Sequence, residues 1–245
     1  MEKCFVIDTT KCTACRGCQV ACKQWHKLPA EKTVNVGSHQ NPQDLSFITY
    51  KLVRFSEHME GDKPQWLFFP EQCRHCILAP CKETADVYVE GAILRDEETQ
   101  AVLFTAKLAQ LSPEERQEVR DNCPYDIPRI DPESGLMSKC DMCIDRVHNG
   151  LLPACVAVCP TGAMNFGDRE DMVKLAQERL AAAKKRYPKA SIIDADDVNV
   201  LYIVSDKPEK YFDKAQADAS HGRGITRKEM FARIFNPVKT LGKLA

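Results

Sequence analysis

CTACRGCQVAC, residues 12–22, contains four cysteines with two, two and three residues between them. This is a spacing at which cysteine thiolates ligate iron-sulfur clusters, and the fourth cysteine of such a run ligates the other cluster of a pair. Soft thiolate ligands favour iron of mixed valence, so the run indicates electron transfer. Twelve of the thirteen cysteines fall into this kind of pattern, and only Cys4 has no partner at a cluster spacing.

A second run near residue 150 completes the pair. CDMC at 140–143 and CVAVCP at 155–160 supply four more cysteines, and the last of them is followed by Pro160, as cross-ligation requires. Each run supplies one cysteine to the cluster of the other run, so every cysteine of the two runs is used as a ligand. We expect cluster one at Cys12, Cys15, Cys18 and Cys159, and cluster two at Cys22, Cys140, Cys143 and Cys155.

The middle of the chain has the pattern of a second pair that has lost one cluster. Cluster three is expected at Cys73, Cys76, Cys81 and Cys123. The ligand positions of a fourth cluster are occupied by Ala85, Pro113, Arg116 and Val119. Residues 112–115 instead indicate the start of a helix, with Ser112 as N-cap and Glu115 completing a capping box. We therefore predict three 4Fe-4S clusters, with ordinary protein in the fourth place.

Three other cysteine chemistries fit the sequence less well. Disulfide-stapled scaffolds are mostly short secreted chains, whereas this chain has 245 residues. Two C-x-x-C pairs can form a zinc ribbon, but a tight four-cysteine run with two Cys-Pro dipeptides fits cluster cross-ligation better. By family resemblance, a radical enzyme that binds S-adenosylmethionine would show C-x3-C-x2-C, and the sequence has no such motif.

Composition is that of an ordinary globular protein, with 44% hydrophobic and 28% charged residues. The formal net charge of -1 gives no reason to expect a nucleic-acid partner. No apolar run approaches the roughly eighteen residues of a membrane span, so none is expected. Residues 207–245 hold nine Lys or Arg against four Asp or Glu, a basic tail that is usually a solvated surface and could dock on an acidic partner.

The repeated order of strand, cysteine loop and helix resembles bacterial ferredoxins, so we expect an α+β fold made of duplicated bacterial ferredoxin-like (2x 4Fe-4S type) domains. Residues 1–168 form the expected cluster domain, interrupted by an insertion at 27–72, and 169–245 form a helix-strand appendage with the basic tail. The apolar end of the insertion, WLFFP at 66–70, is expected to pack or to contact a subunit. Strands are expected at 5–8, 162–166 and 198–204, a hairpin at 91–105, and helices at 19–26 and 170–187.

The remaining chemically notable residues have ordinary interpretations. We expect Cys4 to be a buried small hydrophobe. His75 lies between two ligands and is expected to donate a hydrogen bond near the cluster or to be exposed. Trp25, His26 and Trp66 are expected in the core or an interface. Four cations flank cluster cysteines and could raise a cluster's potential, and the sequence does not say which does: Lys23, Arg74, Lys139 and Arg146.

The sequence also lacks the motifs of a reaction site. It has no GxGxxG fingerprint, no P-loop, and no evident nucleophile with a base. No catalytic residue and no cofactor site beyond the clusters can be named. A chain with three redox centres and no reaction site is expected to carry electrons for a partner.

Four longer motifs show a family resemblance: CTACRGCQVACKQW, FPEQCRHC, CPYDIPRID and KCDMCIDRVHNGLLPACVAVCPTGAMNFGD. They resemble the iron-sulfur subunit of molybdopterin-dependent oxidoreductases and cover most of residues 1–168. Within that group, the single-cluster deletion and the phrase GSHQNPQDLSF at 37–47 are most similar to the beta subunit of the two-subunit tungsten- or molybdenum-containing formate dehydrogenase of sulfate-reducing bacteria.

This resemblance implies a larger catalytic subunit with a tungsten or molybdenum bis-pterin cofactor and one 4Fe-4S cluster, which oxidises formate to carbon dioxide. Electrons would leave through the three clusters to a soluble acceptor, such as a tetrahaem c-type cytochrome. The resemblance also implies a periplasmic location, reached folded on the export signal of the partner, with the cytoplasm as the alternative. Two other readings stay open: an electron-transfer subunit of a polysulfide, thiosulfate or dimethyl sulfoxide reductase or of a hydrogenase, and a free polyferredoxin.

Overall fold

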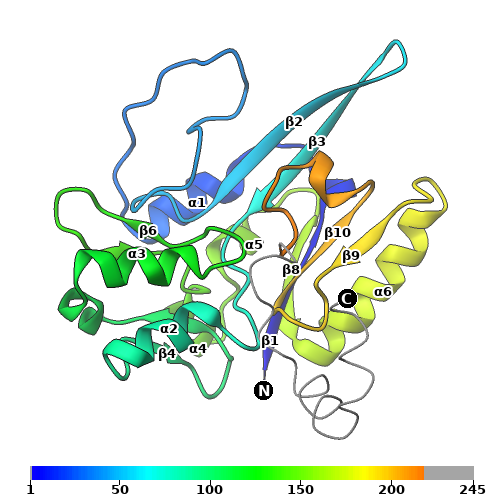
Figure 1. Cartoon of the computed structure of the whole chain (residues 1–245). Helices are drawn as coiled ribbons and strands as arrows, with labels where there is room; N and C mark the ends of the chain where they lie inside the picture. Colours follow the sequence, from blue (N-terminus) through cyan, green and yellow to red (C-terminus); the bar gives the residue numbers. More distant parts are fainter. Residues whose placement is uncertain (1, 218–245) are drawn as a thin grey trace, which may run out of the picture.

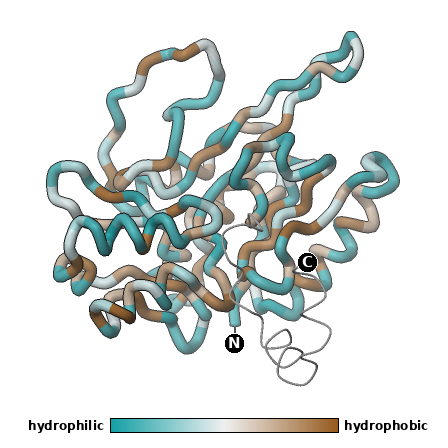
Figure 2. Tube along the Cα trace, in the orientation of Figure 1, coloured by the Kyte–Doolittle hydropathy of each residue, from teal (hydrophilic) through white to brown (hydrophobic). Residues whose placement is uncertain are grey.

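A four-stranded sheet forms the centre of the molecule in the computed structural model, which describes residues 2–217. Its strand order is β8 (Met164–Asp168), β1 (Lys3–Asp8), β10 (Val200–Val204) and β9 (Ser191–Ile193). β1 pairs with β8 antiparallel and with β10 parallel, so residues from both ends of the described chain meet in one sheet. Figure 2 shows the hydrophobic trace of these strands among hydrophilic outer segments.

The two faces of this sheet bury different partners, because side chains alternate along a strand. Cys4 and Val6 pack on the side of helix α6 (Arg169–Lys184). Phe5 and Ile7 face the opposite core, and residues of the cysteine loops belong to both cores. The sheet therefore serves as the wall against which the cysteine loops fold.

The insertion contains a long hairpin of β2 (Leu52–Glu60) and β3 (Lys63–Glu71), which extends away from the body in Figure 1. Near its base, Phe69 is fully buried and stacks on Tyr202 of β10 with ring centroids 4.2 Å apart. Trp66 remains 54% exposed. The expected packing role of the WLFFP segment is therefore confirmed for Phe69, and the insertion is anchored to the central sheet.

The remaining elements surround the cysteines, and α2 and α3 lie on the opposite side of the molecule from α6 (Figure 1). These elements are α1 (Gly17–Trp25), α2 (Pro80–Tyr88), β4 (Ile93–Arg95), β5 (Val102–Phe104), α3 (Pro113–Asp121), β6 (Arg129–Ile130), β7 (Met137–Ser138), α4 (Ile144–His148) and α5 (Ala154–Ala157). Three short 3-10 turns complete the described elements: η1 (Thr9–Lys11), η2 (Ala106–Gln110) and η3 (Pro208–Lys210).

Most expected elements are present within one to three residues of their predicted bounds. The hairpin at 91–105 is confirmed as β4 and β5, and the helix start at Ser112 has both hydrogen bonds of a capping box with Glu115. The C-terminal segment is more integrated than an appendage suggests, because β9 and β10 complete the sheet that holds β1. Most of the basic tail lies outside the described residues. No helix within 2–217 has the length and apolarity that crossing a bilayer requires.

Candidate iron-sulfur sites

Three C-x-x-C loops share one backbone geometry. The residue before the second cysteine has a positive φ in each loop: 53° at Ala14, 46° at His75 and 67° at Met142. Its N–H donates to the sulfur of the first cysteine at 3.4 Å in all three, which are Cys12, Cys73 and Cys140. Non-glycine residues adopt this conformation only where the surrounding structure enforces it, at a cost of about 1–3 kcal/mol each. The repeated geometry marks the three loops as versions of one sulfur-binding turn.

The expected ligands of cluster three lie around one cavity. Cys73 and Cys76 follow β3, Cys81 is in the first turn of α2, and Cys123 follows α3. All four line the same cavity, and the Ile127 N–H donates to the Cys123 sulfur at 3.4 Å. Burial and the other thiols raise the pKa of Cys81 to about 12 and that of Cys123 to about 11. Such thiols become thiolates when a metal supplies compensating charge, so the donor set fits a thiolate-ligated cluster.

The cysteines expected at cluster one also influence each other. Burial, and then repulsion from Cys159 and Cys15, raise the pKa of Cys12. Burial would raise the pKa of Cys159 as well, but hydrogen bonds from the Met164 backbone and the Thr161 side chain lower it below the ordinary thiol value. Cys15 is exposed, whereas the Cys18 thiol on α1 is buried. The loop after Cys159 is therefore built to stabilise a thiolate.

The cysteines expected at cluster two come from α1 and from the loops around α4 and α5. Burial raises the pKa of Cys22 well above its usual value, and repulsion from Cys155 and Cys143 adds to this. Burial likewise raises the pKa of Cys140, with Cys22, Cys73 and Cys143 among its neighbours. No two cysteines of the described chain form a disulfide. The structure thus brings together each of the three expected groups, while ligation itself stays a prediction.

Cysteines of neighbouring groups also influence one another's thiol pKa values. Cys155 of the cluster-two group is among the residues that raise the pKa of Cys18 to about 12, after burial. Cys73 of the cluster-three group likewise acts on Cys140. The three groups therefore form a series, with the cluster-two cysteines in the middle.

Cys4 lies apart from these groups. It is fully buried in β1, and burial raises the pKa of its thiol to about 11. Its neighbours are the backbone and Arg169, which approaches the sulfur at 3.9 Å. The expectation of a buried thiol is confirmed.

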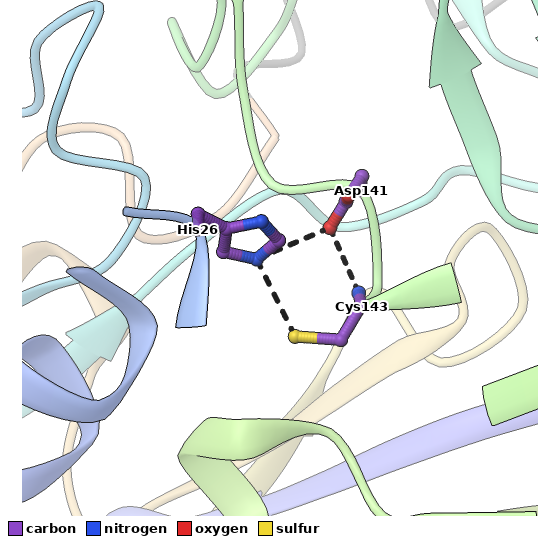
Figure 3. A group of neighbouring side chains, drawn as sticks. All are labelled: His26, Asp141 and Cys143. Carbon is purple, nitrogen blue, oxygen red and sulfur yellow. Dashed lines mark hydrogen bonds and ion pairs between the residues drawn. The ribbon is translucent and has the colours of Figure 1, made fainter. Parts of the chain in front are cut away.

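His26, Asp141 and Cys143 form a contact that sequence analysis did not identify (Figure 3). The His26 Nε2 atom lies 3.5 Å from both the Cys143 sulfur and the Asp141 carboxylate, and this carboxylate accepts from the Cys143 N–H at 2.8 Å. Histidine, cysteine and aspartate together can hold a metal ion. Because Cys143 is an expected cluster ligand, we assign the group to cluster two, where His26 can donate to the sulfur. The only sequence signal was the position of His26, four residues after Cys22.

Buried cations lie near the cysteine groups. Of the four flanking cations, Arg74 and Lys139 are buried, whereas Lys23 bonds carbonyls near the surface and Arg146 stacks on the partly exposed Trp25. Sequence analysis missed Lys51, which is 3% exposed and donates to the Pro70 carbonyl at 2.9 Å and to Gln72 at 2.6 Å. Its charge lowers the pKa values of Cys12, Cys18, Cys22 and Cys155, against the larger effect of burial.

His75 is fully buried, so its expected exposure is wrong and a donor role stays open. Its Nδ1 accepts from the Val102 N–H at 3.0 Å, which leaves the proton of the neutral ring on Nε2. Burial, followed by Lys139 and Arg95, lowers the pKa of His75 well below its ordinary value. Nε2 has no partner among the described residues. His75 does not line the cluster-three cavity, and ligation of iron is not indicated.

The fold and these cysteine groups define an iron-sulfur electron-transfer protein. Residues 64–169 match the family model of the 4Fe-4S dicluster domain. The chain is 53% identical over 216 residues to the formate dehydrogenase 2 subunit beta (cytochrome c-553) of Nitratidesulfovibrio vulgaris, covering 88% of this chain and 99% of that one. It is 55% identical over 217 residues to the formate dehydrogenase subunit beta of Megalodesulfovibrio gigas, covering 89% and 100%. The Escherichia coli formate dehydrogenase-O iron-sulfur subunit is 37% identical over 218 residues, covering 84% and 68%.

This chain belongs to the family of formate dehydrogenase beta, or iron-sulfur, subunits. The resemblance stated from the cysteine motifs is thereby confirmed. As a member of that family it is an electron-transfer component of an oxidoreductase complex and not its catalytic subunit.

Proposed function

We propose that the chain holds three 4Fe-4S clusters and passes electrons between the catalytic subunit of a formate dehydrogenase and an external acceptor. Its twelve ligands would be Cys12, Cys15, Cys18 and Cys159 at cluster one, Cys22, Cys140, Cys143 and Cys155 at cluster two, and Cys73, Cys76, Cys81 and Cys123 at cluster three. The observation that carries this proposal is the single cavity walled by all four cluster-three cysteines.

The place of a fourth cluster is filled by protein, which supports the count of three. Ala85 and Val119, at two of its ligand positions, are both fully buried in one apolar core with Leu108 and Leu111. At a third position, Arg116 donates to the Gly135 carbonyl at 2.8 Å. Apolar packing and a hydrogen bond hold α3 where a duplicated ferredoxin-like unit would hold iron.

Each bound cluster supplies a one-electron carrier, and the protein supplies its ligands and surroundings. The sulfur-binding turns direct an N–H at the first cysteine of each C-x-x-C loop. Such hydrogen bonds favour the more negative, reduced form. The mutual influence of Cys18 and Cys155, and of Cys140 and Cys73, supports a proposed electron route that runs from cluster one through cluster two to cluster three or in reverse.

The proposed partners follow from the family. A larger catalytic subunit with a tungsten or molybdenum bis-pterin cofactor and one 4Fe-4S cluster would oxidise formate to carbon dioxide. A c-type cytochrome would accept the electrons, and the name of the Nitratidesulfovibrio relative includes cytochrome c-553. We place the complex in the periplasm, exported folded. Cell fractionation that finds it in the cytoplasm would contradict this location.

Native purification tests the function directly. The full chain is expected to copurify with a much larger chain, and formate added to that complex should reduce a c-type cytochrome. The matched control is the complex with Cys123→Ala. It should still oxidise formate when a dye accepts electrons directly from the catalytic subunit. It should reduce the cytochrome far more slowly than the unmodified complex. A chain that purifies alone would support a free polyferredoxin, and a complex inert to formate would reject formate dehydrogenase activity.

A further inference from the structure

Two cations line the cavity of the cluster-three cysteines. Arg74 is 2% exposed, and its guanidinium carbon lies 4.2 Å from the centre of the Tyr202 ring and 4.9 Å from those of Phe69 and Tyr125. Lys139 is 7% exposed, and its Nζ lies 4.7 Å from the centre of the Phe104 ring. Both side chains line the same cavity as the four thiols.

Neither cation has a carboxylate partner within ion-pair distance among residues 2–217. Arg74 donates to the carbonyls of Gln72 at 3.3 Å and Ala215 at 3.2 Å. Lys139 donates to the carbonyls of Val102 at 2.5 Å and Cys140 at 3.0 Å. Carbonyls satisfy the hydrogen bonds but do not neutralise the charge. A buried charge is costly unless an opposite charge is near, so the cavity is suited to an anionic group.

Carboxylates in the neighbourhood are already engaged elsewhere. Glu71 is paired with Arg54, and Asp126, which follows Cys123, is paired with Arg120 and Arg129. Glu71 and Asp126 act on this neighbourhood, but neither forms an ion pair with Arg74 or Lys139.

The cluster-two group has a carboxylate hydrogen-bonded to one of its cysteines. The carboxylate of Asp141 accepts from the backbone of Cys143, and both Asp141 and Asp145 raise the pKa of the Cys143 thiol, after burial. The buried cation Lys51 acts on cysteines of both the cluster-one and the cluster-two groups, so its charge is shared between them. At the cluster-three group, two buried cations, Arg74 and Lys139, line the cavity of the thiols.

We propose that Arg74 and Lys139 raise the reduction potential of cluster three above those of clusters one and two, so that the first electron taken up by the chain resides there. Formate oxidation releases carbon dioxide, a proton and two electrons, and each electron that reaches a cluster adds one negative charge. Two unneutralised cations stabilise that added charge most strongly at cluster three. The inference rests on the proposed cluster sites, and both residues act as positioning residues through charge.

A potentiometric titration of the complete complex, followed by electron paramagnetic resonance, tests this. The signal missing from the Cys123→Ala complex identifies cluster three. In the unmodified complex this signal is expected to appear at the highest potential of the three clusters of this chain. In Lys139→Met and Arg74→Gln, the ratio of oxidised to reduced cluster three at a fixed potential should rise at least tenfold, which corresponds to about 59 mV for one electron.

Charge-conserving variants and a surface cation provide the controls. Lys139→Arg and Arg74→Lys should retain the potential, and Lys23→Met, which removes a half-buried cation beside Cys22, should leave cluster three unshifted. Cluster three reducing after either other cluster in the unmodified complex would overturn the inference, even if the variants failed to assemble. Unchanged potentials in fully iron-loaded variants would do so as well. A complex with no third cluster would instead refute the proposed sites.

Discussion

Removing iron from the full chain is expected to abolish its cooperative melting and most of its native circular dichroism. Ligands of each cluster come from distant segments, as with Cys12 and Cys159, so the clusters act as cross-links of the fold. In small metallo-domains a structural metal contributes about 10–16 kcal/mol, whereas an ordinary domain is stable by about 5–15 kcal/mol. The stabilisation lost with three clusters should therefore exceed the free energy of unfolding that the rest of the chain provides.

Cluster removal should destabilise the fold through the residues that surround the empty sites. Cys18 and Cys155 belong to the same apolar core as Phe5 and Tyr202, so emptying their sites loosens the packing against the central sheet. Lys51, Arg74 and Lys139 would also remain buried without a compensating anion. Anaerobic chelation followed by circular dichroism and thermal melting measures this, and reconstitution with iron and sulfide serves as the control. A native-like spectrum with cooperative melting of the iron-free chain would contradict the prediction.

Replacing Cys123 by alanine is expected to remove one cluster and leave two. Cys123 supplies the only cluster-three ligand that lies outside residues 73–81, and it closes the cavity from the end of α3. The variant should lose about four irons per chain, and the spectroscopic signals of clusters one and two should persist. Cys4→Ala is the matched control, because Cys4 is a fully buried thiol that lies in β1 against Arg169, and it should keep all three signals. Loss of a second signal together with cluster three in Cys123→Ala would overturn the pairing of the cysteines.

Local signals explain which parts of the fold could be predicted. The capping box at Ser112 and Glu115 depends on residues three positions apart, and the β4–β5 hairpin joins neighbouring segments. The parallel pairing of Phe5 with Val200 depends instead on segments from opposite ends of the described chain, for which the sequence has no local marker. This is why the C-terminal strand was expected in an appendage and lies in the central sheet.

The same distinction applies to the candidate sites. Cysteine spacing names ligands because the spacing itself reflects how a loop wraps around a cluster. No sequence spacing predicts that a cation is buried. Lys51 is far in sequence from every cysteine, and its environment depends on Pro70, Gln72 and Tyr202, which the fold brings together. Arg74 and Lys139 could be named as neighbours of ligands, but only the structure separates them from the half-buried Lys23 and the stacked Arg146.

Iron and acid-labile sulfide analysis of the full chain, purified without oxygen, tests the three-cluster account most directly. We predict about twelve of each per chain, four for each of the three cysteine groups. About sixteen would contradict the account, because it would require a fourth cluster at the place where Ala85 and Val119 are packed in an apolar core. About eight would contradict it equally, since it would leave one of the three cysteine groups without a cluster.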